Sequence, residues 1–444
     1  MDIVVKVGQL ILMLSILVIL HEFGHYIAAK IFKVRVEKFY LFMDAGFSLF
    51  KKKIGETVWG IGWLPIGGYV KLSGMVDESM DVEQMNSAPQ PWEFRAKPAW
   101  QRLIIMLGGI IVNLILAWFI YTMVFSTYGK KYVATAQIQK NGLSFGETGE
   151  KVGFKDGDRI LSADGVSQER FDRLVLDVLL GDDIKVQRDG KVVNVHLSDA
   201  HKKAILDNEG RNFISPRIVG TSVDSLMGNS NAAKAGMKVG DKIVGIDNKK
   251  MAYFDEVTNE LATHKGDSVT VNLMRGNTPI DVRAKVTKDG TLGFVYKSTN
   301  QENFMITEKY SFFSAIPHAV DESYTQFVYN IKQFKLILRP ATGAASHVKS
   351  PIGIAAALPS TWNWEFFWRF TAIFSIGLAF MNLLPIPGLD GGHALFTIAE
   401  MITGRKLSNK AAERVQTVGM IILLSLMALT FGKDIYQLVK ENFF

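Results

Sequence analysis

The sequence predicts an α-helical polytopic membrane protein with four transmembrane helices and a soluble insertion between the second and the third. Four strongly apolar runs carry this prediction, at Val7–Ala29, Leu103–Phe125, Phe366–Leu384 and Val418–Phe431. A helix needs roughly 20 apolar residues to cross a bilayer, and only the last run has to borrow flanking residues. Residues 129–308, in contrast, are rich in Gly, Asp and Lys, as soluble domains are. The alternative, a soluble protein with four long buried helices, is disfavoured because such runs rarely occur together in soluble folds.

Length and composition allow several structural units. The chain has 444 residues, and roughly 100–200 residues per domain gives two to four units. It contains no cysteine, so no disulfide holds the soluble part, and the redox compartment cannot be inferred from cysteine usage. The first apolar run leads into His21 and Glu22 in place of the small residues of a signal-peptide cleavage site, so we expect an uncleaved first span.

Basic residues predict which side of the membrane each loop faces. The net charge of +7 is modest, but its placement is uneven. Lys and Arg crowd the loop from Lys30 to Arg102, and the loop between the last two spans carries Arg405, Lys406, Lys410 and Arg414. The positive-inside rule puts both loops in the cytoplasm. Both termini and the whole of 129–365 are then extracytoplasmic, and long translocated domains are not bound by this rule.

An internal repeat organises the soluble region. Gly153–Ile160, with the sequence GFKDGDRI, recurs 83 residues later as GMKVGDKI at Gly236–Ile243. Both copies continue to an Asp, then to a helical stretch and a β-rich end, at the following positions: Asp164, Phe171–Leu180 and Ile184–Leu197; Asp247, Phe254–His264 and Ser268–Val286. A Gly-Asp turn, a strand, a helix and a closing hairpin make a small β domain capped by helices.

The first apolar run contains His21-Glu22-Phe23-Gly24-His25, which is the pattern H-E-x-x-H. Ionisable residues inside a membrane span are costly, so three within five positions need an explanation. Residues i and i+4 share one helix face, which lets both imidazoles reach one metal ion, and Glu22 can take a proton from a metal-bound water. The alternatives are a polar network that ties helices together, or an ion pathway.

Asp390 is the best candidate for a third ligand, since catalytic zinc usually takes three protein ligands. It ends Asn382-Leu-Leu-Pro-Ile-Pro-Gly-Leu-Asp390 and precedes two glycines, a composition that must unwind the third span. Non-helical backbone at membrane depth is tolerated only beside protein or a water-filled cavity, which suggests an internal polar site. Counted at 1.5 Å per residue, His21 and Asp390 both fall towards the cytoplasmic end. Of the other histidines, His393 is close to Asp390. The remaining five lie in the soluble or external segments: His196, His201, His264, His318 and His347.

These motifs together resemble the site-2 protease family, most closely its bacterial regulator-of-sigma-E protease group. The resemblance covers nearly the whole chain and implies that His21, His25 and Asp390 bind Zn²⁺ and that Glu22 is the catalytic residue. Asn382 matches a family Asn that contacts substrate or helps to polarise the scissile carbonyl. Imidazole and carboxylate ligands alone would leave the identity of the divalent metal open.

Trp59–Leu72 resembles the family's membrane-associated β-hairpin beside the active site. An exposed strand edge there could extend a substrate segment, because a helix hides the carbonyl groups that a protease must reach. We therefore expect a substrate-binding group made of Gly67, Gly68, Tyr69, Asn382, Pro385 and Pro387. The alternative is an interfacial anchor that acts through Trp59, Trp63 and Tyr69.

Four further segments resemble known families. Gly108–Asn113 matches the G-x-x-x-N pattern of the site-2 proteases, for which close helix packing through glycine is the preferred explanation. Ser350–Gly353 resembles their S-G-P-I segment but lacks the first Gly, which affects backbone fit and not chemistry. The two repeats resemble bacterial PDZ domains, most specifically at Ala232–Asp241. Such domains bind extended peptides or C-termini by strand addition, and a spacer or size filter without a ligand is an equally good alternative.

The expected division of the chain follows from these segments. A first membrane part covers 1–128, with spans at about 5–28 and 101–125 around the cytoplasmic hairpin. PDZ-like α+β domains cover 129–215 and 216–300, and an amphipathic segment covers 301–365. A second membrane part covers 366–444, with the last span at about 415–435. Within the amphipathic segment, Ser311–Leu338 is either a helix on the outer membrane surface or an ordinary packing helix.

The predicted function is an intramembrane zinc metalloprotease of the bacterial inner membrane. We expect it to cut single-span membrane proteins, such as an anti-sigma factor or a signal-peptide remnant, after an upstream site-1-type protease has shortened them. The PDZ pair would exclude intact ectodomains or sense the new terminus, and nothing in the sequence points to nucleic acid. A membrane-tethered PDZ scaffold with a structural metal is one alternative, and an ion or metal transporter is another, although inverted repeats are missing. A PDZ-containing serine protease has no nucleophile motif to support it.

Overall fold

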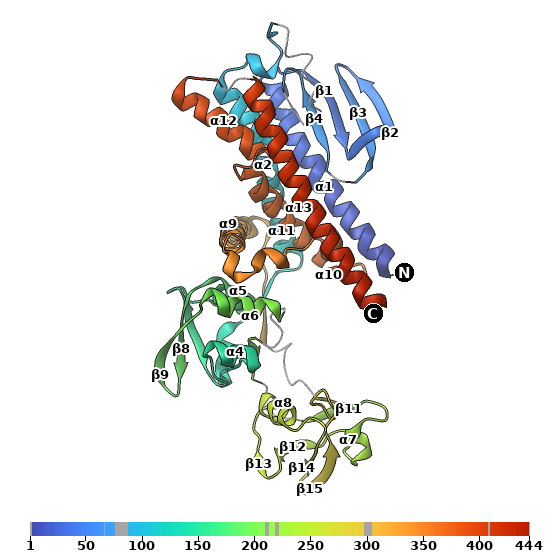
Figure 1. Ribbon diagram of the computed structural model, residues 1–444, viewed down its shortest axis with the longest axis vertical. Coiled ribbons are helices and arrows are strands. Elements are labelled where there is room, and N and C mark those ends of the chain that lie inside the picture. Colours follow the sequence, from blue (N-terminus) through green and yellow to red (C-terminus); the bar gives the residue numbers. More distant parts are fainter. Residues whose placement is uncertain are drawn as a thin grey trace. The chain divides into compact units, whose positions relative to one another are not determined.

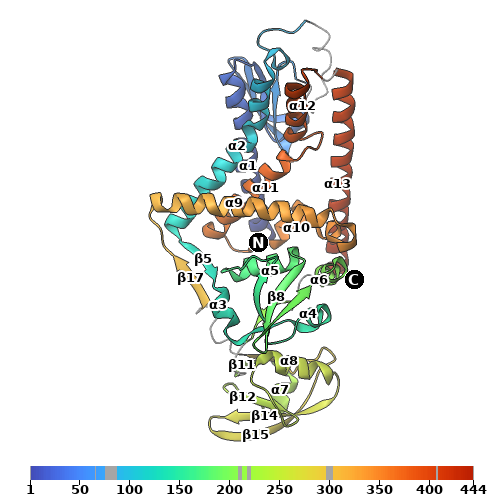
Figure 2. The ribbon, with the colours of Figure 1, turned by 90° about the vertical axis from the view of Figure 1, so that its left-hand side faces the viewer.

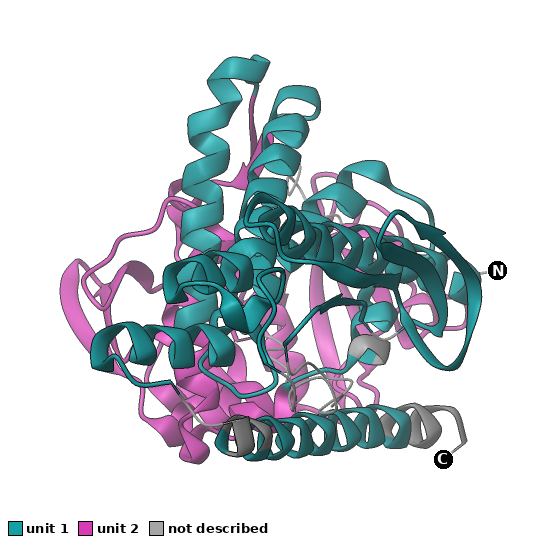
Figure 3. Ribbon diagram, turned by 90° about the horizontal axis from the view of Figure 1, so that it is seen from above, with its two compact units in different colours: residues 1–129, 309–332, 348–444 teal, residues 130–308, 333–347 magenta. Residues whose placement is uncertain are grey.

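The computed structural model describes residues 2–65, 67–75, 88–208, 213–217, 222–296, 304–406 and 409–443. The chain divides into two compact units (Figure 3). Unit 1 is made of residues 1–129, 309–332 and 348–444, and unit 2 of residues 130–308 and 333–347. Of the division expected above, the boundary between residues 300 and 301 lies outside the described residues.

Unit 1 contains four helices that are long and apolar enough to cross a membrane, as the sequence predicted. They are α1 (Asp2–Ile31), α2 (Ala99–Thr127), α11 (Trp364–Leu383) and α13 (Asn409–Phe443), all labelled in Figure 1. The remaining helices of this unit are η2 (Phe94–Ala96), α9 (Phe312–Ile337, which ends in unit 2), α10 (Pro351–Ala357) and α12 (Asp390–Thr403). A polytopic helical membrane protein is thus confirmed within the described part of the chain.

Glycine lets α1 and α2 approach each other closely. A Cβ atom on Gly24 would collide with the carbonyl group of Gly108, and one on Gly108 would lie 2.6 Å from the carbonyl oxygen of Gly24. Small residues allow this kind of backbone contact between membrane helices. The structure therefore supports the packing explanation for the glycines of α2.

The third span breaks where the sequence predicted it would. α11 ends at Leu383 and α12 begins at Asp390, with an irregular segment between them (Figure 2). Proline removes a backbone donor and clashes with the preceding turn, so the two prolines here end α11. Gly392 then lets α12 fold back, because a Cβ atom on it would lie 2.6 Å from the carbonyl oxygen of Ile386.

A four-stranded sheet follows α1, and here the structure corrects one expectation. The strands are β1 (Val36–Leu41), β2 (Met43–Ile54), β3 (Thr57–Leu64) and β4 (Tyr69–Leu72), in the order β2-β3-β1-β4. The predicted hairpin over Trp59–Leu72 is wrong, because β1 lies between β3 and β4, parallel to the former and antiparallel to the latter. The hairpin of this sheet is β2–β3, closed at Gly55 and Glu56, since Ile54 pairs with Thr57. Ile66 of the expected motif lies outside the described residues.

The amphipathic prediction for Ser311–Leu338 corresponds to the single helix α9. Ala315 and Ala319 on one face are fully buried in a cluster with residues of α2 and α11, such as Ala117 and Ile376. Phe313 is 80% exposed. This helix therefore packs with one face and leaves apolar side chains on another, so both explanations given above remain open.

Unit 2 contains both copies of the repeat, each folded as strand, helix and two further strands. The first copy has β7 (Arg159–Ala163), α5 (Phe171–Leu180), β8 (Asp183–Arg188) and β9 (Lys191–His196). The second has β12 (Lys242–Ile246), α8 (Phe254–Thr263), β14 (Ser268–Arg275) and β15 (Thr278–Lys285). The shorter elements of the unit are β5 (Lys130–Val133), α3 (Thr135–Ile138), η3 (Gln139–Asn141), β6 (Leu143–Ser144), α4 (Gly146–Val152), α6 (Asp199–Asp207), β10 (Ser215–Pro216), β11 (Val223–Leu226), α7 (Asn231–Lys234), β13 (Lys249–Lys250), β16 (Phe294–Tyr296), β17 (Met305–Glu308), η5 (Pro340–Thr342) and η6 (Ala344–His347).

One buried ion pair recurs in the two copies and explains the Gly-Asp turn of the repeat. Asp158 accepts hydrogen bonds from Arg188, and Asp241 accepts them from Arg275, at 2.6–2.8 Å. Both aspartates are almost completely buried, and a buried carboxylate must be paired to be tolerated. The repeat is therefore a repeat of structure as well as of sequence.

Candidate active site

Helix α1 brings the two histidines of the H-E-x-x-H pattern together, as the spacing predicted. The Nε2 atoms of His21 and His25 lie 3.4 Å apart, and both side chains are buried. No residue between them breaks the helix, so their relative position is set by one turn of α1.

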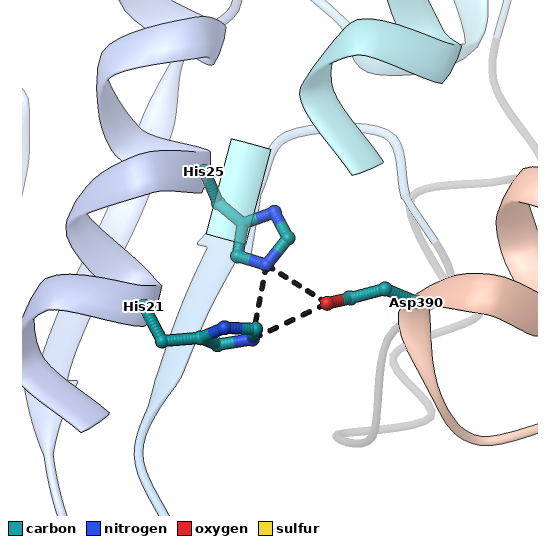
Figure 4. A group of neighbouring side chains, drawn as sticks. All are labelled: His21, His25 and Asp390. Carbon is teal, nitrogen blue, oxygen red and sulfur yellow. Dashed lines mark hydrogen bonds and ion pairs between the residues drawn. The ribbon is translucent and has the colours of Figure 1, made fainter. Parts of the chain in front are cut away.

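Asp390 joins the two histidines from α12, 365 residues after His25 in the chain. Its Oδ2 atom lies 3.2 Å from Nε2 of His21 and 3.2 Å from Nε2 of His25 (Figure 4). Asp390 is the first residue of α12, where the helix dipole favours a negative charge. The break between α11 and α12 therefore places a carboxylate at the histidine pair.

These three side chains fit a zinc ion. In a tetrahedral site with donor atoms about 2.0–2.1 Å from the metal, neighbouring donors are about 3.3–3.4 Å apart. The three distances observed between donors, 3.2, 3.2 and 3.4 Å, agree with this value. In addition, Oδ2 of Asp390 is buried and accepts no hydrogen bond of good geometry from the described residues. Two imidazoles and a carboxylate are a common ligand set of catalytic zinc.

Helix α2 supplies groups behind the histidine rings. The carbonyl oxygen of Ile105 lies 2.8 Å from Nδ1 of His25, and Nδ2 of Asn113 lies 3.1 Å from Nδ1 of His21. Asn113 is completely buried. The sequence singled it out only as the end of a glycine pattern and missed this contact. The signal that could have found it is its position four residues after Gly109, on the same face of α2.

Asn382 also reaches the site, as predicted, from the last turn of α11. Its Nδ2 atom lies 3.2 Å from Nε2 of His21, and the side chain is buried. A carboxamide at this place presents an N–H donor towards the space between the histidines and the carboxylate. Such a donor can bind a carbonyl oxygen of a substrate.

A cavity of about 380 Å³ opens onto these residues. Its lining includes Glu22, His25, Asn382 and Asp390. Glu22 is half-buried, next to His21 on α1 and on the cavity side. A carboxylate on this cavity wall, together with the histidines, can act as a general base towards a water molecule in the cavity.

The sheet borders the same cavity through its edge strand β4. Gly68 and all of Tyr69–Leu72 line it, and β4 pairs only with β1 among the described strands. Gly68 packs tightly against α1, because a Cβ atom on it would lie 2.6 Å from Cγ1 of Val18. A polypeptide in the cavity would therefore meet an open strand edge on one side.

Not every predicted residue lines the cavity. Gly67, Pro385 and Pro387 are absent from its lining, and Pro387 instead meets Gly419 of α13 through its backbone. His393 lines the cavity but does not belong to the group of three close donors. The other histidines contact residues elsewhere, for example His196 with Asp183 and His318 with Tyr310.

Comparison with known proteins defines the class of this membrane protein. The sequence model of peptidase family M50 matches residues 9–426, so the chain belongs to this family, the site-2 proteases. It is a metalloprotease. A protein of Neisseria meningitidis with the name "Putative zinc metalloprotease" is 29% identical over 96% of this chain and 97% of its own length.

The relatives include proteins named regulator of sigma-E protease RseP. The Escherichia coli protein of this name is 26% identical, and the alignment covers 97% of this chain and 98% of that protein. The Salmonella typhimurium protein is 27% identical over 98% and 99%, respectively. The chain is thus similar to zinc metalloproteases over nearly its full length, and the three-donor cluster supports zinc as its metal.

Proposed function

We propose that this protein is an intramembrane protease that hydrolyses peptide bonds of single-span membrane proteins at a zinc site held by His21, His25 and Asp390. The observation that carries this proposal is the cluster of three donors, 3.2–3.4 Å apart, which faces a cavity between membrane helices. Zinc bound there would act as a Lewis acid and make a water molecule acidic enough to attack a carbonyl carbon.

The protein's own residues supply the proton transfers. Glu22 takes a proton from the attacking water and delivers it to the amine nitrogen of the leaving fragment. The amide of Asn382 donates a hydrogen bond to the oxygen of the scissile carbonyl, where negative charge develops during attack. Both side chains line the cavity together with Asp390, which supports these roles.

Strand β4 holds the substrate in an extended form. A substrate that pairs with the open edge of β4 exposes its peptide groups, whereas a helical substrate keeps them in internal hydrogen bonds. Gly68 and Tyr69 are the residues of the expected substrate-binding group that line the cavity with Asn382. Gly67, Pro385 and Pro387 would act less directly, by setting the paths of the segments that carry these residues.

The substrates we propose are anti-sigma factors or signal-peptide remnants whose ectodomains have first been shortened by a site-1-type protease. The names of the Escherichia coli and Salmonella relatives, which refer to sigma-E regulation, support the first kind. The two repeats of unit 2 would act as PDZ-like domains, either as a size filter or as sensors of the new terminus. Their shared strand–helix–strand–strand fold agrees with this resemblance.

We place the protein in the bacterial inner membrane, with the loop from Lys30 to Arg102 in the cytoplasm. The basic residues of this loop and of Arg405–Arg414 support this orientation. Unit 2 and both termini would then be extracytoplasmic, and the zinc site would lie towards the cytoplasmic side. The relatives that are named RseP support a bacterial inner-membrane location.

Substitution of the proposed general base tests this function. Purified Glu22→Gln protein should contain zinc at the wild-type level but should not cleave a single-span membrane substrate that has a short extracytoplasmic segment. Glu56→Gln, at an exposed turn of the sheet, is the matched control and should cleave at the wild-type rate. Cleavage by Glu22→Gln at the wild-type rate would refute the proposal. Zinc without any cleavage by the wild type would favour the scaffold alternative.

A further inference from the structure

Helix α2 faces the outer nitrogen of each histidine in the site. Ile105, Gly109 and Asn113 are spaced by four residues, so they lie on one face of α2. The Ile105 carbonyl oxygen meets Nδ1 of His25, and the side chain of Asn113 meets Nδ1 of His21. Each histidine thus presents Nε2 to Asp390 and Nδ1 to α2.

The tautomer of each ring decides whether its Nε2 atom can bind a metal. A neutral imidazole has one N–H group and one lone pair, so a ring that binds metal through Nε2 must carry its proton on Nδ1. The carbonyl group of Ile105 can only accept a hydrogen bond, and it therefore selects the useful tautomer of His25. His21 needs an acceptor at the same place, and Asn113 is the side chain that lies there.

Asn113 can provide this acceptor by a half-turn of its side chain. In the present arrangement Nδ2 faces His21, and Oδ1 is buried without a hydrogen-bond partner among the described residues. A half-turn would bring Oδ1 to His21 and turn Nδ2 to the buried position that Oδ1 occupies now, so one end of the amide stays unpaired in either orientation. The two ends of a carboxamide are nearly equal in size, so a half-turn about the last side-chain bond exchanges Oδ1 and Nδ2 without moving other groups.

We propose that Asn113 is a positioning residue whose Oδ1 accepts the Nδ1 proton of His21 and so keeps Nε2 of His21 available for the metal. This inference rests on the proposed function, because it takes His21 as a zinc ligand. The half-turn of Asn113 lowers the free energy only when metal is bound. His21 then carries a proton on Nδ1, and the present orientation of Asn113 would place its Nδ2–H group against that Nδ1–H group. The side-chain amide of Asn113 thus adopts the orientation that metal loading requires.

Asn113 has a buried neighbour on α11 that does not face the histidines. Asn113 is fully buried, and its backbone carbonyl oxygen accepts a hydrogen bond of 2.7 Å from the hydroxyl group of Ser375 on α11. Ser375 is also fully buried, and its described hydrogen bond goes to Asn113 and not to a histidine. It therefore offers a control for general damage to the packing between α2 and α11.

Zinc affinity of the purified full-length protein in detergent, measured by competition with a chromophoric chelator, tests the inference. Asn113→Leu and Asn113→Ala remove the acceptor and should weaken zinc binding about 10–100-fold, the usual effect of losing a partner of a metal-bound histidine. Asn113→Asp keeps an oxygen acceptor and should bind zinc within a few-fold of the wild type or more tightly. Ser375→Ala should bind zinc like the wild type. Metal-free thermal unfolding of each variant separates loss of affinity from loss of folding.

The possible outcomes separate this inference from the proposed function. Wild-type zinc affinity in Asn113→Leu and Asn113→Ala, with affinity lost in Asp390→Ala, would overturn the role of Asn113 alone. Equal weakening in Asn113→Asp and Asn113→Leu would also overturn it, because the acceptor oxygen would then be irrelevant. Wild-type affinity in Asp390→Ala and His21→Ala would overturn both the zinc site and the inference built on it.

Discussion

Gly109 of α2 lies so close to His25 of α1 that a Cβ atom on Gly109 would stand 2.5 Å from Nε2 of His25. The same atom would lie 2.5 Å from Cε1 of His21. Real Cβ contacts essentially never fall below 3.0 Å, and the obstacle here is a pair of rings fixed in a helix. The bare backbone of α2 therefore forms one wall of the proposed zinc site.

Substitution of Gly109 by Ala should remove zinc while leaving the fold intact. The added methyl group would displace the two imidazoles, whereas alanine is a better helix former than glycine by up to about 1 kcal/mol. We expect at least a tenfold loss of zinc affinity in metal analysis, with the metal-free protein still folded, because the gain in helix propensity offsets part of the roughly 1–3 kcal/mol that overpacking costs. Gly377→Ala, on α11 with open space at its Cβ position, is the control and should keep its zinc. A zinc-replete Gly109→Ala protein would contradict the proposed position of the metal.

Substitution of Gly68 should impair substrate binding without affecting metal binding. A methyl group on Gly68 would meet Val18 of α1 at 2.6 Å and the carbonyl oxygen of Tyr40 at 2.7 Å, so Gly68→Ala should push β4 away from α1. We expect full zinc content and a fall in kcat/KM of about tenfold or more for a single-span substrate. Gly8→Ala, where a Cβ atom meets nothing within 4 Å, should cleave normally. Unchanged cleavage by Gly68→Ala would argue against a role of β4 in holding the substrate.

The proposed orientation in the membrane can be tested by labelling, since the chain has no cysteine of its own. Lys250→Cys in β13 and Lys52→Cys in β2 replace exposed residues of the two units. In spheroplasts, a membrane-impermeant maleimide should label the cysteine at position 250 directly and the cysteine at position 52 only after permeabilisation. Labelling in the opposite pattern would reverse the orientation deduced from the basic loops.

Unit 2 should lose part of its stability in acid because of Asp182. Hydrogen bonds from Arg339, and further contacts with Lys202, lower the pKa of the Asp182 carboxyl from 3.8 to about 2. A lowered folded-state pKa stabilises the fold above about pH 4, and this contribution disappears as the pH falls from about 4 to 2. The side chains of Arg339 and Asp182 are 43% and 39% exposed, so solvent screens the pair and Arg339→Met should cost only about 0.5–1 kcal/mol at pH 7.

Amide hydrogen exchange of α6 in the full protein would measure this contribution. The difference in protection between the wild type and Arg339→Met should be largest near neutral pH, should shrink steeply below pH 4 and should vanish only below pH 2. Arg283→Met, at an exposed position of β15, should leave the exchange of α6 unchanged. A difference that stays constant down to pH 2 would show that Arg339 stabilises the unit by packing and not through the charge of Asp182.

Much of the site could be predicted from the sequence because local rules determine it. The spacing of His21 and His25 follows from the helix period alone. The prolines and glycines around Asp390 showed where α11 must end, although the residues that form the site are far apart in the chain. In contrast, the contact of Asn113 with His21 depends on how α1 and α2 rotate about their own axes. Hydropathy says little about that rotation, and only Gly109 pointed to the face that is used.

The sheet shows why topology is harder to predict than the presence of strands. Trp59–Leu72 does cover most of one strand, β3, and all of another, β4. Sequence neighbours usually pair as a hairpin, but β1 pairs with both of them and separates them. The strand order depends on long-range pairing between Val36–Leu41 and two later strands, and no local sequence pattern predicts this pairing.

The distance in the chain between His21 and Asp390 also sets a time at which the protein can become active. The ribosome must add 369 residues after His21 before the carboxylate exists, and α11 must be inserted and broken before Asp390 can meet the histidines. A nascent chain that ends before residue 390 has both imidazoles but lacks the third donor. The proposed zinc site is therefore complete only in chains that have passed residue 390.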